Sequence, residues 1–320
     1  MLSYIHSKSP NFQPLNFIFL FLGGQKVVFK PQRYERDYIV QGESWDGFDR
    51  HNAEVAAFHL DHLLNFRRAP FVVGRKLHMR NEILPVAGEQ LRATFRKIRN
   101  ETDDLGKPKL CFFGKCYYCK EQDLACPQGK DSGLLEGSLN LWMGKAGYGF
   151  GKLRHPYQRT YKKNKKATWE VNEDYCNHHV KVKEPYNKGP RLLDVTDGSV
   201  FDYLIMNGDR HHYEIFQAFG DEAMMIMMDN AKSYGNPELF DKSILAPMKQ
   251  CCILRKNTFE AIKNFRGRLG KVLDESMKTD PIYPIVTQSH LDAMDKRLEH
   301  VIETVNTGCD LMNFEKKRGI

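Results

Sequence analysis

The chain has 320 residues, of which 41% are apolar and 28% charged, and its formal net charge is +8. This composition is typical of a globular protein, and it excludes a transmembrane helix, because no apolar run approaches the length of about 20 residues that spans a bilayer. The basic residues gather between Arg154 and Lys166. Such a stretch is more often a solvated face than a site for an anionic polymer, and no nucleic-acid-binding motif accompanies it.

The first predicted elements lead to a lysine. The apolar residues 17–22 run directly into a pair of glycines, which indicates a strand and a turn rather than the core of a signal peptide. A targeting segment is therefore expected to be missing from this sequence or to be unconventional. The stretch 23–31 predicts a turn and then a short buried strand, which Pro31 terminates. Lys30 is expected to project from the end of that strand.

A helix is predicted after the next polar loop, because apolar residues recur at helical spacing between Ala53 and Leu64. Asp49 is expected to be its N-cap, where a carboxylate accepts hydrogen bonds from the first free amides. Glu54 follows on the same helix. Either acid is therefore a candidate to face Lys30 across a groove.

The cysteines are even in number and unevenly spaced. They are Cys111, Cys116, Cys119, Cys126, Cys176, Cys251, Cys252 and Cys309. The first four suit either nested disulfides or a zinc site, and disulfides are favoured because a structural zinc site normally pairs one close couple with a second. A glycosylation sequon, Asn100-Glu101-Thr102, lies just before them. Both features indicate an oxidising, extracytoplasmic compartment.

The second half contains the most informative passage. Residues 136–144 predict a short apolar strand that could connect two lobes, and residues 191–206 predict a buried helix that Asn207 and Gly208 end. A polar loop, DRHHYEIF, begins at residue 209, and the apolar stretch 223–229 predicts a strand. The remainder, from about residue 243 onward, is expected to be mostly helical.

Several polar residues on these elements fit phosphoryl transfer. That reaction needs a cation on the nucleotide phosphates, acids that hold a divalent metal, and a carboxylate near the attacking hydroxyl. Lys30 and Asp49 fit the first two roles, and Asp209 lies where a general base belongs. Glu214 occupies the position at which protein kinases carry a metal-binding Asn, and Asp229 closes the apolar stretch as the metal-binding Asp of those enzymes does.

Spacing alone leaves other interpretations open. An acid at the end of a strand is more often a turn signal than a metal ligand, and an acid before a helix is usually only a cap. The adjacent His211 and His212 also suggest a metallohydrolase that would use the same acids. That alternative requires a further well-placed histidine, and the candidates His178 and His179 lie in a charged segment without a regular pattern.

At these residues the chain resembles the secretory-pathway kinases, the family of the Golgi casein kinase, and within it the xylosylkinase branch. The resemblance extends from about Gly23 to Phe314. The motifs that carry it are FKP (29–31), DRHNAEVAAFHLD (49–61), CYYC (116–119), EGSL (136–139), DRHHYE (209–214) and SILAP with QCC (243–252). Asp rather than Glu at position 49 and the stretch DNAKSYGNP (229–237) resemble the xylosylkinases rather than the kinases that phosphorylate proteins.

The resemblance implies an α+β, bilobal, atypical protein-kinase-like fold stabilised by disulfides. It implies a small β-rich N-lobe over residues 1–139, a hinge over 140–143 and a larger helical C-lobe over 144–320. The implied disulfides are Cys111–Cys126, Cys116–Cys119, Cys176–Cys251 and Cys252–Cys309. One departure concerns the first strand, where Pro14 and Asn16 stand in place of the family's Gln and Lys, so the strand that covers the nucleotide is less well defined.

The resemblance also implies a role for each candidate residue. Asp209 is the implied catalytic base, and Asp49 and Asp229 are the implied metal ligands. The implied ATP-binding residues are Lys30, Asp49, Asn140, Leu141, Trp142, Met143, Glu214 and Asp229, and Asn100 is the implied glycosylation site. The implied cofactors are ATP and Mn²⁺, with Mg²⁺ as a second metal.

The implied reaction is phosphorylation of the 2-hydroxyl of xylose in the linkage region of proteoglycans, in the Golgi lumen or after secretion. The implied partners are the linkage oligosaccharide and either a second copy of the chain or a related kinase. Two alternatives use the same residues differently. One is a lumenal kinase for serine in acidic motifs, and the other is a pseudokinase that activates a relative, for which the unusual first strand is the main argument.

Overall fold

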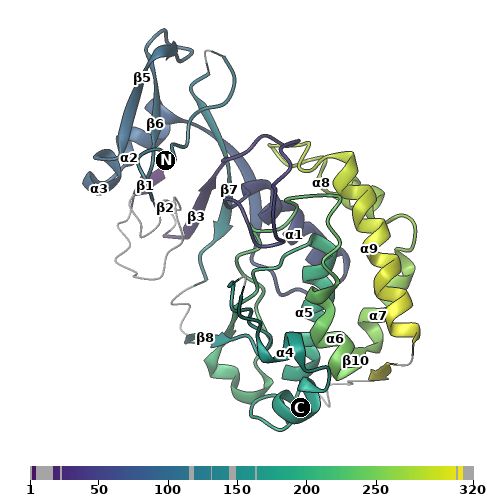
Figure 1. Cartoon of the computed structure of the whole chain (residues 1–320). Helices are drawn as coiled ribbons and strands as arrows, with labels where there is room; N and C mark the ends of the chain where they lie inside the picture. Colours follow the sequence, from purple (N-terminus) through teal and green to yellow (C-terminus); the bar gives the residue numbers. More distant parts are fainter. Residues whose placement is uncertain are drawn as a thin grey trace.

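The computed structural model describes residues 2–4, 17–21, 24–114, 119–130, 132–143, 149–162, 164–307 and 309–312. The first part of the chain is rich in strands and the last part is helical (Figure 1). No helix in the described ranges is both long enough and apolar enough to span a membrane.

An antiparallel sheet with the strand order β1-β2-β3-β7-β4 dominates the first part. Its strands are β1 (Leu2–Tyr4), β2 (Phe17–Phe21), β3 (Lys26–Pro31), β4 (Val72–His78) and β7 (Leu134–Leu141). A separate hairpin of β5 (Phe95–Thr102) and β6 (Pro108–Phe112) projects from it, next to the short helices α2 (Leu84–Val86) and α3 (Glu89–Arg92) (Figure 1). Buried Phe29, Leu77 and Leu135 share one apolar core with residues of the hairpin.

The expected strand that ends near Lys30 is present as β3, which pairs with β7 so that Lys30 lies opposite Ser138. Helix α1 (His51–Leu63) packs against β4 and β7 and also against α8 (Figure 1). Its apolar residues, such as Ala56 and Leu60, belong to the core of the helical part. The helix therefore joins the two parts, and any side chain near its start lies close to both.

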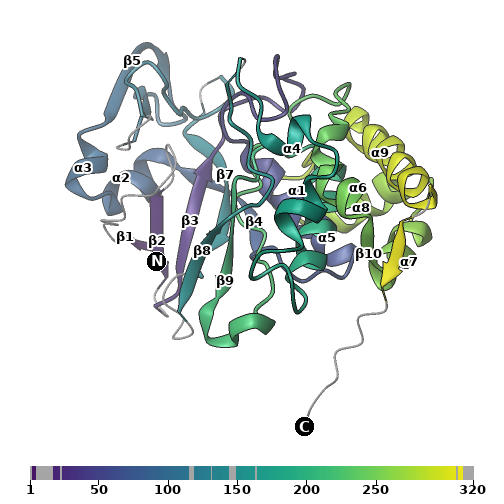
Figure 2. The ribbon, with the colours of Figure 1, turned by 60° about the horizontal axis from the view of Figure 1, so that its bottom comes forward.

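The helical part is built around α5 (Arg191–Ile205), in which every residue is buried. The other helices are α4 (Thr168–Val171), α6 (Ala246–Cys251), α7 (Lys256–Asn264), α8 (Leu269–Met277) and α9 (Gln288–Asn306). Two further strand pairs are β8 (Phe150–Arg154) with β9 (His212–Phe216), and β10 (Ile253–Arg255) with β11 (Asp310–Met312) (Figure 2). The predicted helix over 191–206 is thus confirmed to within one residue.

Two predictions about local structure are wrong. Asp49 is not the N-cap of α1, because the helix begins at His51 and Arg50 occupies the cap position without a capping side chain. The apolar stretch 223–229 is not a strand of any length, since only Ile226 pairs, with Glu214. The amide of Met225 instead donates to Asp194 Oδ2 at 3.0 Å, which satisfies the backbone through a helix side chain.

Three of the four implied disulfides are confirmed. They are Cys111–Cys126, Cys176–Cys251 and Cys252–Cys309. Cys251 bonds to a residue earlier in the chain, and Cys252 bonds to one later in the chain. The two disulfides therefore tie the end of α6 both to residue 176 and to Cys309, which directly precedes β11. Cys116, the fourth pair's first member, lies outside the described residues.

The connection between α8 and α9 also contacts the sheet. The amide of Gly74 on β4 donates to Asp280 Oδ2 at 2.9 Å, and Arg36 donates to the carbonyls of Ile282 at 2.9 Å and Pro284 at 2.6 Å. Arg36 also forms an ion pair with Glu136 on β7, with 2.5 Å between Nη2 and Oε1. The two parts of the molecule are therefore joined here as well as through α1 and through the chain that follows β7.

Candidate active site

Lys30 lies between two carboxylates that come from different parts of the chain. Its Nζ atom is 2.5 Å from Glu54 Oε1 on α1 and 2.6 Å from Asp229 Oδ1. Burial alone would lower the pKa of Lys30, but the charges of Asp229 and Glu54 outweigh it and raise that pKa. Lys30 is therefore an ammonium group. Of the two acids expected to face it, Glu54 makes the contact.

Asp229 is the second partner of Lys30 and has a left-handed backbone, with φ of 59°. Burial opposes its ionisation, but the neighbouring Lys30 ammonium outweighs that effect and lowers the pKa of Asp229 to about 2. The amide that follows, that of Asn230, donates to Glu54 Oε1 at 3.1 Å. Asp229 thus contacts Lys30 and Asn230 contacts Glu54. These two contacts hold the carboxylate of Asp229 in place.

Asp49 lies at the edge of the same cluster with an unsatisfied atom. Its Oδ2 is buried and has no hydrogen-bond partner among the described residues, while Oδ1 is 3.6 Å from the Nζ of Lys232. Burial raises the pKa of Asp49, although the charge of Lys30 counteracts this, and Asp229 contributes a repulsive interaction. A carboxylate oxygen without a partner, close to an ionised aspartate, is suited to a cation.

These acids fit a divalent metal that is bound together with a nucleotide. The described residues contain no group of three side chains arranged as metal ligands. Magnesium-type ions in nucleotide sites use only one or two carboxylates, and phosphate oxygens and water complete the coordination. Asp49 and Asp229 supply that number of carboxylates, and Lys30 supplies a cation for the phosphates.

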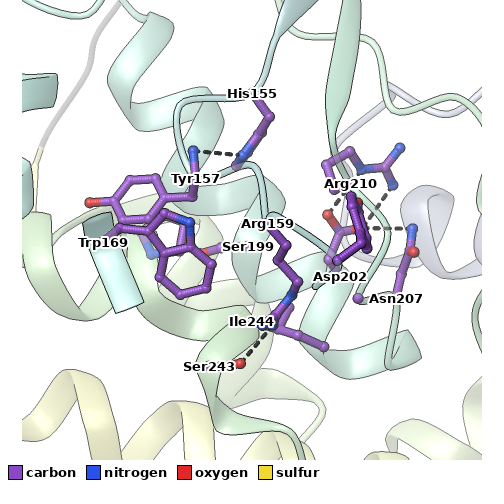
Figure 3. A pocket seen from close by; sticks show the side chains of 13 residues that line it. His155, Tyr157, Arg159, Trp169, Ser199, Asp202, Asn207, Arg210, Ser243 and Ile244 are labelled. Atoms are coloured by element: carbon purple, nitrogen blue, oxygen red, sulfur yellow. Dashed lines mark hydrogen bonds and ion pairs between the residues drawn. The ribbon is translucent and has the colours of Figure 1, made fainter. Parts of the chain in front are cut away.

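The loop that carries Asp209 is fixed by buried polar contacts. Arg210 donates to Asp202 on α5 at 2.7 Å (Figure 3). It also donates to Asn230 Oδ1 at 2.6 Å and to the carbonyl of Met228. The side-chain oxygen of Asn207 accepts a hydrogen bond from the amide of Asp209 at 3.1 Å. Arg210 therefore connects this loop to the segment around Asp229, so the two predicted acids are held in one framework.

The carboxylate of Asp209 is accessible, with 19% of its side chain exposed. The Nδ1 atom of His211 is 3.4 Å from its Oδ1, and the hydroxyl of Tyr161 forms a hydrogen bond with it. The hydrogen bond with Asp209 raises the pKa of His211 and outweighs the burial of the ring, which acts to lower that pKa. A carboxylate in this setting can orient a hydroxyl and accept its proton.

Glu214 and the 140–143 segment flank the cluster. Glu214 lies on β9, buried, with Oε1 at 3.1 Å from His212 Nε2. Asn140 and Leu141 end β7, and the side-chain Nδ2 of Asn140 donates to Ser138 Oγ at 3.0 Å. Trp142 and Met143 follow directly, and the backbone amide of Trp142 donates to the backbone carbonyl of Lys26 at 3.0 Å. Their contacts with a nucleotide stay predictions.

The metallohydrolase interpretation gains no support from the structure. His178 lies on the surface at residues 176–180 and pairs with Asp174 at 2.6 Å. The neighbouring His179 stacks on Tyr175. In the described part of the chain, neither histidine contacts the acids of the cluster. Neither can therefore be the further metal ligand that a metallohydrolase would need.

Sequence reasoning missed the residues that hold the acids in place. Arg210, Asp202 and Asn207 line a small pocket beneath the Asp209 loop, together with His155 and Arg159 (Figure 3). A buried acid on an apolar helix, followed by an arginine eight positions later, is the signal that could have indicated the Asp202–Arg210 pair.

The comparisons with known proteins agree with this geometry. A family model described as "Golgi casein kinase, C-terminal, Fam20" matches residues 6–316. The glycosaminoglycan xylosylkinase of Homo sapiens is 51% identical over 94% of this chain and 71% of its own length. That of Danio rerio is 52% identical over 88% of this chain and 66% of its own length. An extracellular serine/threonine protein kinase of Homo sapiens, FAM20C, is 38% identical over 91% of this chain and 49% of its own length.

Solved structures show the same architecture. The structure of hydra Fam20 with sugar matches with a TM-score of 0.85 and 45% identity, over 96% of this chain and 84% of the other. The Golgi casein kinase with Mn/ADP bound matches with a TM-score of 0.85 and 35% identity, over 95% and 71%. The expected α+β, bilobal, kinase-like fold is thereby confirmed, and the chain belongs to the Fam20 family, whose model carries the name of the Golgi casein kinase.

Proposed function

We propose that this chain is an ATP-dependent kinase that phosphorylates the 2-hydroxyl of xylose in the linkage region between glycosaminoglycan and protein. The observation that carries the proposal is the higher identity to two xylosylkinases than to the serine/threonine kinase of the same family. The site supports it with a lysine paired to two acids and with an accessible carboxylate at Asp209.

In this proposal Asp209 is the catalytic base. The sugar hydroxyl attacks the γ-phosphorus, a bond forms between its oxygen and the phosphorus, the bond to the leaving ADP oxygen breaks, and the hydroxyl proton passes to Asp209. Lys30 neutralises phosphate charge, and Asp49 and Asp229 hold the divalent cation. The cation, which we propose to be Mn²⁺, would screen the charge between the phosphates when it is bound.

The compartment belongs to the same proposal. Disulfides such as Cys176–Cys251 form in oxidising compartments, and the relatives include proteins named as Golgi and extracellular kinases. We therefore place the chain in the Golgi lumen or outside the cell. Asn100 lies exposed on β5, where an oligosaccharide can be attached. Treatment of the secreted protein with an amidase specific for N-glycans should lower its mass, and Asn100→Gln should abolish that change.

A side-by-side assay tests the acceptor. Labelled ATP is offered with a xylose-containing linkage oligosaccharide and, separately, with a casein-like acidic peptide. We expect label on the oligosaccharide. Label on the peptide alone would favour the lumenal serine kinase instead. The absence of transfer to both, with nucleotide still bound, would favour the pseudokinase, although the acids that a dead enzyme is free to lose are present at positions 49, 209, 214 and 229.

A further inference from the structure

Arg50, next to Asp49, is buried, and among the described residues its side chain donates hydrogen bonds to backbone carbonyls only. Its Nε donates to the carbonyl of Ser233 at 2.6 Å, one terminal nitrogen donates to that of Lys232, and the other donates to that of Phe48 at 3.2 Å. Its amide donates to the carbonyl of Ala231 at 2.8 Å. One residue thus contacts three consecutive residues of the segment that follows Asp229.

The guanidinium of Arg50 is held by carbonyl dipoles rather than by a salt bridge. No ion pair with a carboxylate includes Arg50 among the described residues, and burial lowers its pKa to about 10, an effect that the nearby charge of Asp49 only partly offsets. A buried charge that is not neutralised by a partner carries a desolvation cost. What distinguishes Arg50 is the place of its contacts, which join the residue after Asp49 to the segment that follows Asp229.

The contacts of Arg50 connect the two acids proposed to bind metal. Asp49 precedes Arg50 directly in the chain. On the other side, the segment 230–233 is a compact turn in which Ser233 donates to the carbonyl of Asn230 from both its hydroxyl, at 2.6 Å, and its amide, at 3.1 Å. A displacement at Ser233 is therefore transmitted to Asn230 and Asp229. The guanidinium suits this role because its planar group directs several donors at once, whereas an ammonium group cannot reproduce that arrangement.

We infer that Arg50 is a positioning residue that sets the separation of Asp49 and Asp229 and thereby the affinity of the site for a divalent cation bound with nucleotide. The inference rests on the proposed assignment of those two acids.

Arg297 provides a matched control. It is also fully buried, it donates to the backbone carbonyls of Leu204 at 3.2 Å and Leu239 at 3.1 Å, and burial lowers its pKa to about 10 as well. In the described part of the chain its side chain donates to no residue of the acidic cluster. Arg50→Lys and Arg297→Lys should therefore both lower the melting temperature, while only one of them should affect metal binding.

The experiment measures Mn²⁺ binding directly. Free Mn²⁺ is followed by electron paramagnetic resonance in a titration of the full chain with a non-hydrolysable ATP analogue, and melting temperatures are recorded on the same samples. We expect Arg50→Lys to weaken Mn²⁺ binding about 10- to 100-fold, the range typical of residues that orient metal ligands. Arg297→Lys should stay within about twofold. In turnover assays Arg50→Lys should raise the Mn²⁺ concentration for half-maximal rate more than it lowers the rate at saturating Mn²⁺.

Unchanged Mn²⁺ affinity in Arg50→Lys, or an equal loss in both variants, would overturn the inference. Absence of Mn²⁺ binding in the unmodified chain would instead contradict the proposed metal site itself. If Arg50→Lys does not fold, Gly235→Ala replaces it, because a Cβ atom there would lie 3.1 Å from the Arg50 Nη2 and would require the guanidinium to shift by a few tenths of an ångström. That variant should weaken Mn²⁺ binding in the same direction, and wild-type affinity would overturn the inference.

Discussion

Replacement of Lys30 by Met tests the electrostatics of the site. Lys30 is the cation between Glu54 and Asp229, so its removal leaves two carboxylates facing each other. The lowering of the pKa of Asp229 from 3.8 to about 2 corresponds to about 2.5 kcal/mol. This energy is an upper value for the contribution of Asp229, because 29% of its side chain is exposed and water screens the interaction.

Glu54 adds to the loss because it is almost fully buried. Breaking a buried pair by removing one partner typically costs about 3–5 kcal/mol. We therefore expect Lys30→Met to lower the free energy of unfolding by about 3 kcal/mol at neutral pH. At about 2.1 cal/mol/K per residue, a chain of 320 residues then melts about 4–5 °C lower.

The pH dependence has a definite sign. A carboxylate whose pKa is lower in the folded state stabilises the fold above its unfolded pKa and loses that effect as pH falls through the folded pKa. For Asp229 the window extends from about 4 down to about 2. The difference between wild type and Lys30→Met should therefore be constant near neutral pH and fall to about half by about pH 3.

Urea denaturation at several pH values measures both quantities. Lys109→Met is the control, because Lys109 is also buried and pairs with Glu101 at 2.7 Å, but 56% of the Glu101 side chain is exposed. Water can solvate that carboxylate after the lysine is removed, so the control should lose only about 1 kcal/mol. Equal stability of Lys30→Met and wild type, or a difference that persists unchanged to about pH 3, would refute the electrostatic argument.

Three further predictions concern the base, a disulfide and the contact between the two parts. Asp209→Ala should leave the affinity for a fluorescent ATP analogue nearly intact and lower turnover by about 10²- to 10⁴-fold; turnover that survives would exclude Asp209 as the base. Removing the disulfide in Cys176→Ser/Cys251→Ser, whose residues are 75 positions apart, should cost about 4 kcal/mol in urea denaturation, and a negligible loss would contradict the loop-closure estimate. Gly74→Ala would place a Cβ atom 2.1 Å from Ile282 Cγ1, so calorimetry should show a loss of about 1–3 kcal/mol, and wild-type stability would contradict the close packing.

The sequence predicts those parts of the site that depend on neighbouring residues. Pro31 marks the end of a strand, so the position of Lys30 on β3 follows from local pattern. The buried helix before Asp209 is equally clear from its periodicity, and the structure places it at Arg191–Ile205. In both cases the signal lies within a few residues of the group that it positions.

Other features depend on residues far apart in the chain. The choice of Glu54 over Asp49 as the partner of Lys30 is set by the start of α1 at His51, which contacts Glu136 on β7 at 2.6 Å. The stretch 223–229 is apolar and has the pattern of a strand, but the amide of Met227 donates to the carbonyl of Arg68 at 3.0 Å instead of to a neighbouring strand. Neither contact has a local signal, so periodicity alone predicts the wrong element.

The sequence predicts that Asp49 caps helix α1, and the reason that it does not is also the reason that we propose it as a metal ligand. An N-cap aspartate is satisfied by the first amides of its helix, whereas Asp49 lies one residue further back and leaves Oδ2 buried without a partner in the described structure. An unsatisfied buried carboxylate oxygen costs free energy unless something binds it. A cation shared by Asp49 and Asp229 would supply the missing partner of Asp49 Oδ2, so the proposed metal site accounts for a buried carboxylate oxygen that the described residues leave without a hydrogen bond.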